Sequence, residues 1–214
     1  MILEHLGLKR VPPFEEWRRN KILVLHMEAP HLDVEDSLRS TEIPFTSIAY
    51  DTENLESELS KLLDESFGII ITGSIKKGGR YPEIPNIVLE SDHPKLGLCY
   101  GCEKLGIYLG AGLVECNSGV GEYGETECVL MTSPLFDNID ITGSVPVYMA
   151  HHLMLDRVPD GCTLIARTKQ TTIAGFQNKG RNIFGLQFHP EKNWLGDTIF
   201  KNFYSICESS SKVL

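Results

Sequence analysis

Two cysteines stand three residues apart where a short apolar run gives way to a helical pattern. Cys99 lies between Gly97 and Gly101, and Cys102 follows it. A side chain between the end of a strand and the start of a helix points into the crevice where open α/β sheets bind ligands. The helix amino terminus lowers the pKa of a thiol toward a reactive thiolate, and flanking glycines relieve crowding at a tight turn. The sequence therefore predicts that Cys99 is a nucleophile, with the N–H of Tyr100 able to face an oxyanion.

The same cysteine pair allows an interpretation of a different class. A Cys-x-x-Cys motif at the start of a helix is also how thioredoxin-like redox sites are built. A zinc site would have to recruit ligands from scattered positions, because the chain has no second Cys-x-x-Cys motif. His151 and His152 are adjacent, and neighbours on a strand face opposite ways, so they cannot easily share one ion. We expect no metal and no cofactor.

A histidine and a carboxylate supply what a thiol nucleophile needs. Pro190 biases His189 toward an extended backbone, in which residues two apart project to the same side. Glu191 can then accept a hydrogen bond from one ring nitrogen and leave the other to act as a base toward a thiol. Cys99, His189 and Glu191 are thus expected to be nucleophile, base and orienting group. The redox interpretation has no use for this set.

The elements around these residues follow the pattern of an α/β fold. Strand-like runs at 21–25, 45–49, 67–71 and 96–98 alternate with helical patterns, which indicates βαβ units. Helices are expected to carry apolar residues at 55, 59, 62 and 63, and at 105, 107, 109 and 113. Later short pieces at 127–131, 145–149, 163–166 and 183–188 predict a hairpin-rich half. We expect an open, mixed but mainly parallel sheet flanked by helices.

Length and composition limit the classes of function. The 214 residues are 42% apolar and 23% charged, which predicts one globular domain with a real core. We expect residues 1–20 to be an amino-terminal extension and residues 21–214 to be the domain. The formal net charge of −9 disfavours nucleic acid and anionic membranes as partners. The chain has no membrane-length apolar run and no secretion signal, and its six cysteines suit a reducing compartment, so we expect a cytoplasmic location.

The sequence resembles the class I, or triad, glutamine amidotransferases from about residue 21 to residue 207. Residues 97–103, GLCYGCE, match the cysteine elbow of that family, and residues 185–191, GLQFHPE, match its histidine segment. Within the family, the sequence is most similar to the glutaminase subunits of GMP synthases. That likeness lies in the motifs at 121–124, 133–136, 149–151, 158–161, 201–203 and 206–207.

This resemblance implies a flavodoxin-like fold and hydrolysis of the glutamine side-chain amide through a cysteine thioester. It implies that Cys99 attacks, that His189 protonates the departing ammonia and then activates water, and that Glu191 holds the imidazole. The family's other site residues correspond to the oxyanion donors Gly73 and Tyr100 and to the substrate-binding residues Glu103, Tyr123 and His151. Ammonia would pass to a separate ATP-pyrophosphatase (synthetase) chain, because this chain has no phosphate-binding Gly-x-x-x-x-Gly-Lys-Ser/Thr loop.

Three positions depart from the family pattern. Gly73-Ser74-Ile75 stands where the family has Gly-Gly-Pro, and Cys102-Glu103 stands where it has His-Gln. His152-Leu153 ends a segment that lacks the family's acid. A carboxylate at position 103 cannot donate a hydrogen bond unless it is protonated. The alternatives are therefore a γ-glutamyl hydrolase or peptidase acting on another γ-glutamyl amide, a Cys-x-x-Cys redox protein, and a regulatory module without turnover.

Overall fold

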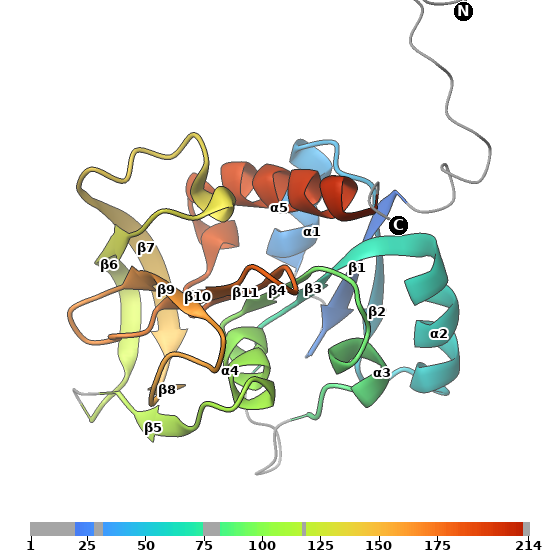
Figure 1. Cartoon of the computed structure of the whole chain (residues 1–214), viewed down its shortest axis with the longest axis horizontal. Coiled ribbons are helices and arrows are strands. Elements are labelled where there is room, and N and C mark those ends of the chain that lie inside the picture. The colour runs from blue at the N-terminus through green and yellow to red at the C-terminus, as the bar shows by residue number, and fades with distance from the viewer. Residues whose placement is uncertain (1–19, 28–31, 75–81, 117–118, 212–214) are drawn as a thin grey trace, which may run out of the picture.

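A computed structural model of the chain describes residues 20–27, 32–74, 82–116 and 119–211. Within these ranges, nine strands form one sheet in the order β2-β1-β3-β4-β11-β10-β9-β6-β7, with helices on both faces (Figure 1). The five strands from β2 to β11 run parallel to their neighbours. The pairs from β11 to β7 are antiparallel. The expected mixed, mainly parallel sheet with a hairpin-rich half is confirmed.

The parallel part consists of β1 (Lys21–His26), β2 (Phe45–Ala49), β3 (Ser66–Ile71), β4 (Lys95–Leu98) and β11 (Ile183–Leu186). The antiparallel part consists of β6 (Glu122–Leu130), β7 (Ser144–His151), β9 (Thr163–Arg167) and β10 (Gly175–Asn178). A separate pair is formed by β5 (Leu113–Glu115) and β8 (Leu153–Leu155). The helices are α1 (Leu32–Ser40), α2 (Leu55–Glu65), α3 (Asn86–Leu89), α4 (Tyr100–Tyr108) and α5 (Leu195–Ser211), with 3-10 turns η2 (Pro134–Phe136) and η3 (Pro190–Lys192).

The central strands are apolar on both sides because both faces of the sheet are covered. In β1, Ile22 and Val24 belong to the core under α1 and α5, whereas Leu23 and Leu25 belong to the core under α2, α3 and α4. Successive strand residues face opposite sides, so one strand serves both cores. The expected leucine face of α2 is confirmed, since its buried residues pack into the second core.

The helix after Cys99 is shorter than the sequence predicts. α4 ends at Tyr108, and Gly110 adopts a φ of +91°. The N–H of Ala111 then donates to the carbonyl of Gly106 at 3.0 Å, as at helix ends closed by a left-handed glycine. The prediction that Leu113 belongs to this helix is wrong, because Leu113 lies in β5.

Several predictions fall outside the described residues. They concern residues 1–19 of the expected extension, together with Ile75 of the glycine loop. The division into an extension and a domain therefore stays a prediction, as does the cytoplasmic location. In the described part of the chain, no helix has the length and apolar character needed to cross a membrane.

Candidate active site

Cys99 occupies a strained turn between β4 and α4. Its backbone has φ +50° and ψ −106°, a conformation that side chains other than glycine rarely adopt. Two glycines make the turn possible. A β-carbon on Gly97 would lie 2.4 Å from the carbonyl oxygen of Gly101, and a β-carbon on Gly101 would lie 2.3 Å from that of Ile71. The expected strand, turn and helix are present, and the thiol sits at the amino end of α4.

His189 and Glu191 meet directly after β11. Nδ1 of His189 and Oε1 of Glu191 are 2.7 Å apart, and both side chains are buried. The pairing follows the sequence prediction, but its local cause differs. Pro190 begins the 3-10 turn η3 instead of continuing an extended segment, and the turn brings Glu191 back beside the ring.

Gly73 lies between the thiol and the imidazole. A β-carbon built on Gly73 would be 4.0 Å from Sγ of Cys99 and 3.3 Å from Cε1 of His189. The three residues follow the ends of β3, β4 and β11, which are neighbouring parallel strands. Since the carboxyl ends of parallel strands meet at one edge of the sheet, residues far apart in sequence converge there. The backbone N–H of Cys99 also donates to the carbonyl of Leu186, the last residue of β11, at 2.8 Å.

The charged form of His189 is stabilised by its neighbours. Burial by itself lowers the pKa of a histidine, but contact with Cys99 and Glu191 outweighs burial and raises the pKa of His189 to about 10. Nε2 of His189 is buried and makes no hydrogen bond to the residues that the structure describes. It is the ring nitrogen left to exchange a proton with a thiol or a bound molecule. An imidazolium held beside a cysteine is the arrangement that activates thiol nucleophiles.

Both predicted oxyanion donors are next to Cys99. Tyr100 is the first residue of α4, so its N–H follows the nucleophile in the first helical turn. Its ring is buried, and its hydroxyl donates to the carbonyl of Pro82. A β-carbon on Gly73 would project toward Cys99 and His189, as described above. Because the loop is described only as far as Ser74, the role of Gly73 as a donor stays a prediction.

Glu103 lies one turn into α4 and faces the protein interior. Its N–H donates to the carbonyl of Cys99 at 3.1 Å, and its carboxylate accepts a hydrogen bond from Nε2 of Gln187 at 3.0 Å. Burial raises the pKa of Glu103 to about 7, although Gln187 and Lys104 act in the opposite direction. The carboxyl group therefore changes charge near neutral pH. Its predicted contact with a substrate stays a prediction, since the structure gives it an internal partner.

Tyr123 stands at the exposed side of the same region. Its side chain is 65% exposed, and in the sheet it is paired with Ala150 of β7. The thiol of Cys99 points toward the carbonyl oxygen of Ala150, with Sγ and oxygen 3.8 Å apart. Tyr123 thus lies one strand away from an atom that contacts Cys99, where a bound molecule could reach it. Its substrate-binding role stays a prediction.

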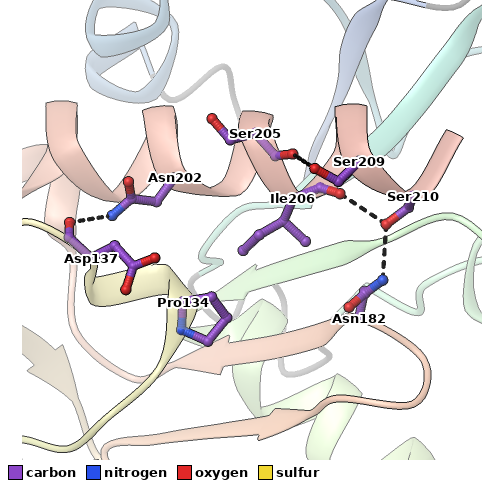
Figure 2. A pocket seen from close by; sticks show the side chains of 8 residues that line it. All are labelled: Pro134, Asp137, Asn182, Asn202, Ser205, Ile206, Ser209 and Ser210. Carbon is purple, nitrogen blue, oxygen red and sulfur yellow. Dashed lines mark hydrogen bonds between the residues drawn. The ribbon is translucent and has the colours of Figure 1, made fainter. Parts of the chain in front are cut away.

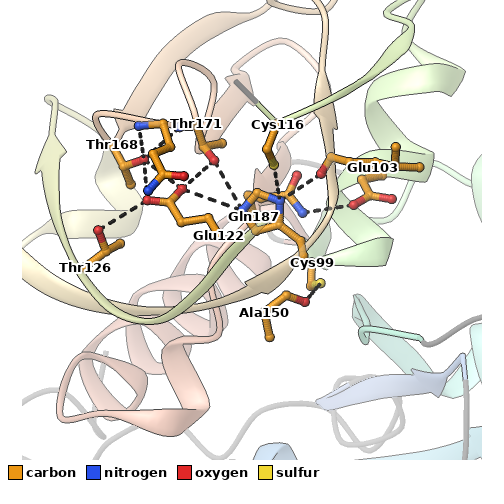
Figure 3. A network of polar contacts seen from close by, with 12 residues as sticks. Cys99, Glu103, Cys116, Glu122, Thr126, Ala150, Thr168, Thr171 and Gln187 are labelled. Carbon is orange, nitrogen blue, oxygen red and sulfur yellow. Dashed lines mark hydrogen bonds and ion pairs between the residues drawn. The ribbon is translucent and has the colours of Figure 1, made fainter. Parts of the chain in front are cut away.

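His151 is buried and contacts Glu122 and Thr171, which belong to the polar network drawn in Figure 3. Nδ1 of His151 is 2.8 Å from the carbonyl oxygen of Leu153, and Nε2 is 3.2 Å from the hydroxyl oxygen of Thr171. Burial lowers the pKa of His151, while the Leu153 carbonyl and Glu122 raise it. Both ring nitrogens already have internal partners, so its predicted contact with a substrate also stays a prediction.

The centre of this network is Glu122, which belongs to the motif at 121–124 but for which the sequence analysis predicted no role. The carboxylate of Glu122 is 3% exposed and accepts hydrogen bonds from the hydroxyls of Thr126, Thr168 and Thr171. The one local signal in the sequence is the spacing of Thr168 and Thr171. The N–H of Thr171 donates to the Thr168 hydroxyl oxygen at 2.8 Å, as in short threonine turns.

The position of Cys102 argues against the redox alternative. Its side chain is fully buried and packs toward Gly185, where an added β-carbon would lie 2.9 Å from its sulfur. Burial raises the pKa of Cys102 well above its usual range. Thiol exchange needs a thiolate that can reach the other sulfur, and both cysteines are free thiols. The described residues also contain no group of three or more His, Cys, Asp or Glu side chains that could hold a metal ion.

A surface groove of about 480 Å³ lies apart from these residues (Figure 2). It is formed by α5, η2 and the turn that precedes β11. Nδ2 of Asn202 donates to the carbonyl of Asp137 at 2.7 Å, and Nδ2 of Asn182 donates to the hydroxyl of Ser210 at 2.9 Å. Its lining includes none of the residues around Cys99, so it is not the candidate active site.

Comparison with known proteins identifies one family. The sequence model of glutamine amidotransferase class-I matches residues 32–206. A GMP synthase [glutamine-hydrolyzing] of Ruthia magnifica subsp. Calyptogena magnifica is 34% identical over 163 residues, which cover 72% of this chain and 31% of that protein. The corresponding protein of Clostridium tetani is 35% identical over 147 residues, which cover 66% of this chain and 28% of that protein. The chain thus spans less than a third of the length of these relatives.

Solved structures give the same picture of the fold. A Thermoplasma acidophilum protein described as a GMP synthase subunit superposes with a TM-score of 0.74 and 25% identity, covering 90% of this chain and 96% of that one. The PurLQS structure from Thermotoga maritima superposes with a TM-score of 0.66 at 19% identity, covering 87% of this chain and 99% of that one. The second likeness concerns the fold alone.

Proposed function

Since the chain belongs to the class I glutamine amidotransferases, we propose that it hydrolyses the side-chain amide of glutamine on Cys99 and delivers the ammonia to a synthetase. The observation that carries this proposal is the convergence of Cys99, His189 and Glu191 at one edge of the sheet. A β-carbon on Gly73 would lie 4.0 Å from the thiol sulfur and 3.3 Å from Cε1 of the imidazole, and Glu191 accepts a hydrogen bond from the other side of the ring. The GMP synthases among the relatives support the choice of glutamine as substrate.

The proposed reaction uses the thiol and the imidazole in turn. The thiolate of Cys99 attacks the amide carbon, and the resulting oxyanion accepts hydrogen bonds from the N–H groups of Tyr100 and Gly73. The imidazolium of His189 gives its proton to the departing nitrogen, the C–N bond breaks, and a thioester and ammonia remain. His189, now neutral, takes a proton from water as the water attacks the thioester. The C–S bond then breaks, glutamate leaves, and the Cys99 thiolate and the His189 imidazolium are restored.

Glu191 acts on the ring and does not contact the substrate in this scheme. Its carboxylate accepts a hydrogen bond from Nδ1 of His189, which fixes the orientation of the ring and leaves Nε2 for the reaction. The same carboxylate favours the imidazolium, which the first step requires.

We further propose that the synthetase is an ATP-dependent one on a separate chain, of the kind that makes GMP. The curated relatives that support this are whole GMP synthases, and the match covers less than a third of each. Ammonia is small and escapes readily into solution, so docking of the two chains would favour its direct transfer to the second active site. We expect added synthetase to raise glutamine turnover.

The test of the main proposal is ammonia release from glutamine by purified protein. Cys99→Ala and His189→Asn should each lower the rate by at least about a thousandfold, as losses of triad members do. Cys162→Ser is the matched control, because this thiol lies outside the site and should leave the rate unchanged. Full activity in Cys99→Ala would reject the assigned nucleophile.

A panel of other γ-glutamyl amides and peptides decides between glutaminase and γ-glutamyl peptidase activity. Glutamine should be the preferred substrate. When this protein is mixed with a synthetase that also uses free ammonia, GMP should form from glutamine only if Cys99 is intact. Faster cleavage of γ-glutamyl peptides than of glutamine would favour the peptidase alternative. Full loss of activity in Cys102→Ser, with the fold intact, would favour the redox alternative.

A further inference from the structure

One strand, β7, contacts both proposed reacting side chains. The carbonyl oxygen of Ala150 lies 3.8 Å from Sγ of Cys99 (Figure 3). The carbonyl oxygen of Tyr148 accepts the backbone N–H of His189 at 2.9 Å. The rings of Tyr148 and His189 also meet edge to face, with centroids 6.4 Å apart. A shift of β7 would therefore move the surroundings of the thiol and of the imidazole together.

His151 is the buried polar residue at the end of this strand. The other inward side chains of β7 are apolar, and among the described strands β7 is the last of the sheet and pairs with β6 alone. An edge strand is held by one neighbour instead of two, so its side-chain contacts matter more for its position. His151 directly follows Ala150 and anchors that end of the strand in the network around Glu122.

Each ring nitrogen of His151 has a hydrogen-bonding oxygen partner within the protein. A carbonyl oxygen only accepts, so the contact with Leu153 requires a proton on Nδ1. The hydroxyl oxygen of Thr171 lies 2.6 Å from Oε2 of Glu122 and 3.2 Å from Nε2 of His151. Thr171 has one proton, and the shorter contact places it toward Glu122. With the Thr171 proton directed to Glu122, Nε2 donates to the Thr171 oxygen when the ring is charged.

The same cluster does not form a second nucleophile. Sγ of Cys116 lies 3.4 Å from Nδ1 of His151, and Glu122 lies on the other side of the ring. This order of thiol, imidazole and carboxylate is the same as in Cys99, His189 and Glu191. However, Nδ1 already holds a proton for the Leu153 carbonyl, so it cannot take one from the thiol. Burial raises the pKa of Cys116 further from reactivity.

We propose that Glu122, Thr171 and His151 form a buried positioning chain that holds β7 against Cys99 and His189. This inference rests on the proposed glutaminase function for its consequence, since β7 affects turnover only through the two reacting residues. His151 does not touch the substrate in this proposal. Its ring contacts the Leu153 carbonyl on one side and is linked through Thr171 to Glu122 on the other, which fixes the carbonyl of Ala150 beside the thiol.

The charges around His151 set the pH range in which the chain is complete. Burial, His189 and His152 oppose the imidazolium and together outweigh the Leu153 carbonyl and Glu122, so the pKa of His151 lies below its ordinary value. Cys116 is a neutral neighbour. We therefore expect the Nε2 proton to be lost as the pH rises, while the Nδ1 proton is kept for Leu153.

The test compares Thr171→Val with Thr171→Ser and Thr126→Val. Thr171→Val removes the bridge between Glu122 and His151, Thr171→Ser keeps the hydroxyl, and Thr126→Val removes a hydroxyl from Glu122 that does not contact His151. The readouts are the alkylation rate of Cys99 by iodoacetamide between pH 5 and 9, kcat and KM for glutamine, and nitrogen NMR of the His151 ring. Melting temperatures check that each variant is folded.

For Thr171→Val we expect slower alkylation of Cys99 and a kcat about tenfold lower, with KM changed less than twofold, since small misplacements of reacting groups cost at least this much. The NMR spectrum should lose the Nε2 proton at a lower pH. Thr171→Ser and Thr126→Val should stay within about twofold of the unaltered protein in both rates.

Either of two results would overturn the proposal. A folded Thr171→Val protein with unchanged alkylation and kcat would mean that the chain does not position β7. An equal loss in Thr126→Val would mean that the effect comes from Glu122 alone. If Thr171→Val slows alkylation but no variant releases ammonia from glutamine, the positioning chain stands and the proposed function fails.

Discussion

Cys99 and His189 are each held in a state that the free residue does not favour. The cysteine has a positive φ, and the histidine keeps its proton because Cys99 and Glu191 outweigh the effect of burial. Such states persist only where surrounding contacts enforce them, and they are typical of catalytic sites. At the scale of the residue, the shifted pKa values of His189 and Glu103 give measurable consequences.

The first consequence is a dependence of stability on pH through His189. The folded pKa is about 10 and the reference value is 6.5, so the stabilisation is complete below about pH 6.5 and is lost as the pH rises through about 10. We expect the free energy of unfolding to fall across this window. His189→Gln should flatten that slope, as urea denaturation at pH 6, 8 and 10 can measure. Parallel slopes for the two proteins would contradict the raised pKa.

The second consequence concerns Glu103. Its folded pKa is about 7 against a reference value of 4.5, so stability is lost as the pH rises through about 7. Glu103→Gln keeps an acceptor for Gln187 but carries no charge. We expect this change to raise the free energy of unfolding at pH 8 relative to pH 5, by up to about 3 kcal/mol. Glu125→Gln on the exposed side of β6 is the control, and equal effects of Glu103→Gln at both pH values would contradict the prediction.

At the scale of the element, the turn between β4 and α4 depends on glycines that allow close backbone contact. A β-carbon on Gly101 would meet the carbonyl of Ile71 in β3, which is backbone and cannot move aside as a side chain could. The glycine thus sets how closely α4 approaches the sheet, and with it the position of Cys99. The fold could not place the thiol there with a larger residue.

We therefore expect Gly101→Ala to lower the free energy of unfolding by about 2 kcal/mol or more, as overpacking does, and to lower glutamine turnover as well. Gly143→Ala is the matched control, because an added β-carbon there has no atom within 4 Å. Chemical denaturation and ammonia release measure the two effects. A Gly101→Ala protein as stable and active as Gly143→Ala would show that the close approach is not required.

At the scale of the whole molecule, one core joins the parallel and the antiparallel halves. It contains both Phe203 of α5 and Val147 of β7, the strand at the antiparallel edge of the sheet. The site stands where the halves meet, since Cys99 and His189 follow the adjacent strands β4 and β11 while β7 reaches them from the other half. Each half alone would leave the site incomplete.

A shared core predicts that the two halves unfold together. Phe203→Ala and Val147→Ala should each lower the free energy of unfolding, by about 3 to 5 kcal/mol for the phenylalanine and less for the valine, and each variant should keep one common transition. Far-ultraviolet circular dichroism and tryptophan fluorescence should give coincident curves for both variants. Separate transitions in either variant would mean that the halves fold independently.

The sequence by itself determined the features that depend on neighbouring residues. The glycines around Cys99 predicted the turn, Pro190 and Glu191 predicted the partner of His189, and the apolar periods predicted most strands and α2. The end of α4 was missed because a left-handed Gly110 stops the helix inside a continuing apolar pattern. Backbone preference and hydrophobic period act over a few residues, so such features can be read locally.

Only the tertiary structure decided which distant groups meet. The contact of Gly73 with His189, the approach of Ala150 to Cys99 and the hydrogen bond from Thr171 to Glu122 join residues from separate elements. No sequence pattern around Glu122 predicts that its carboxylate is buried and accepts hydrogen bonds from three hydroxyls. The physical reason is that these contacts depend on strand order and on the path of the chain across the sheet, which the packing of the whole core selects.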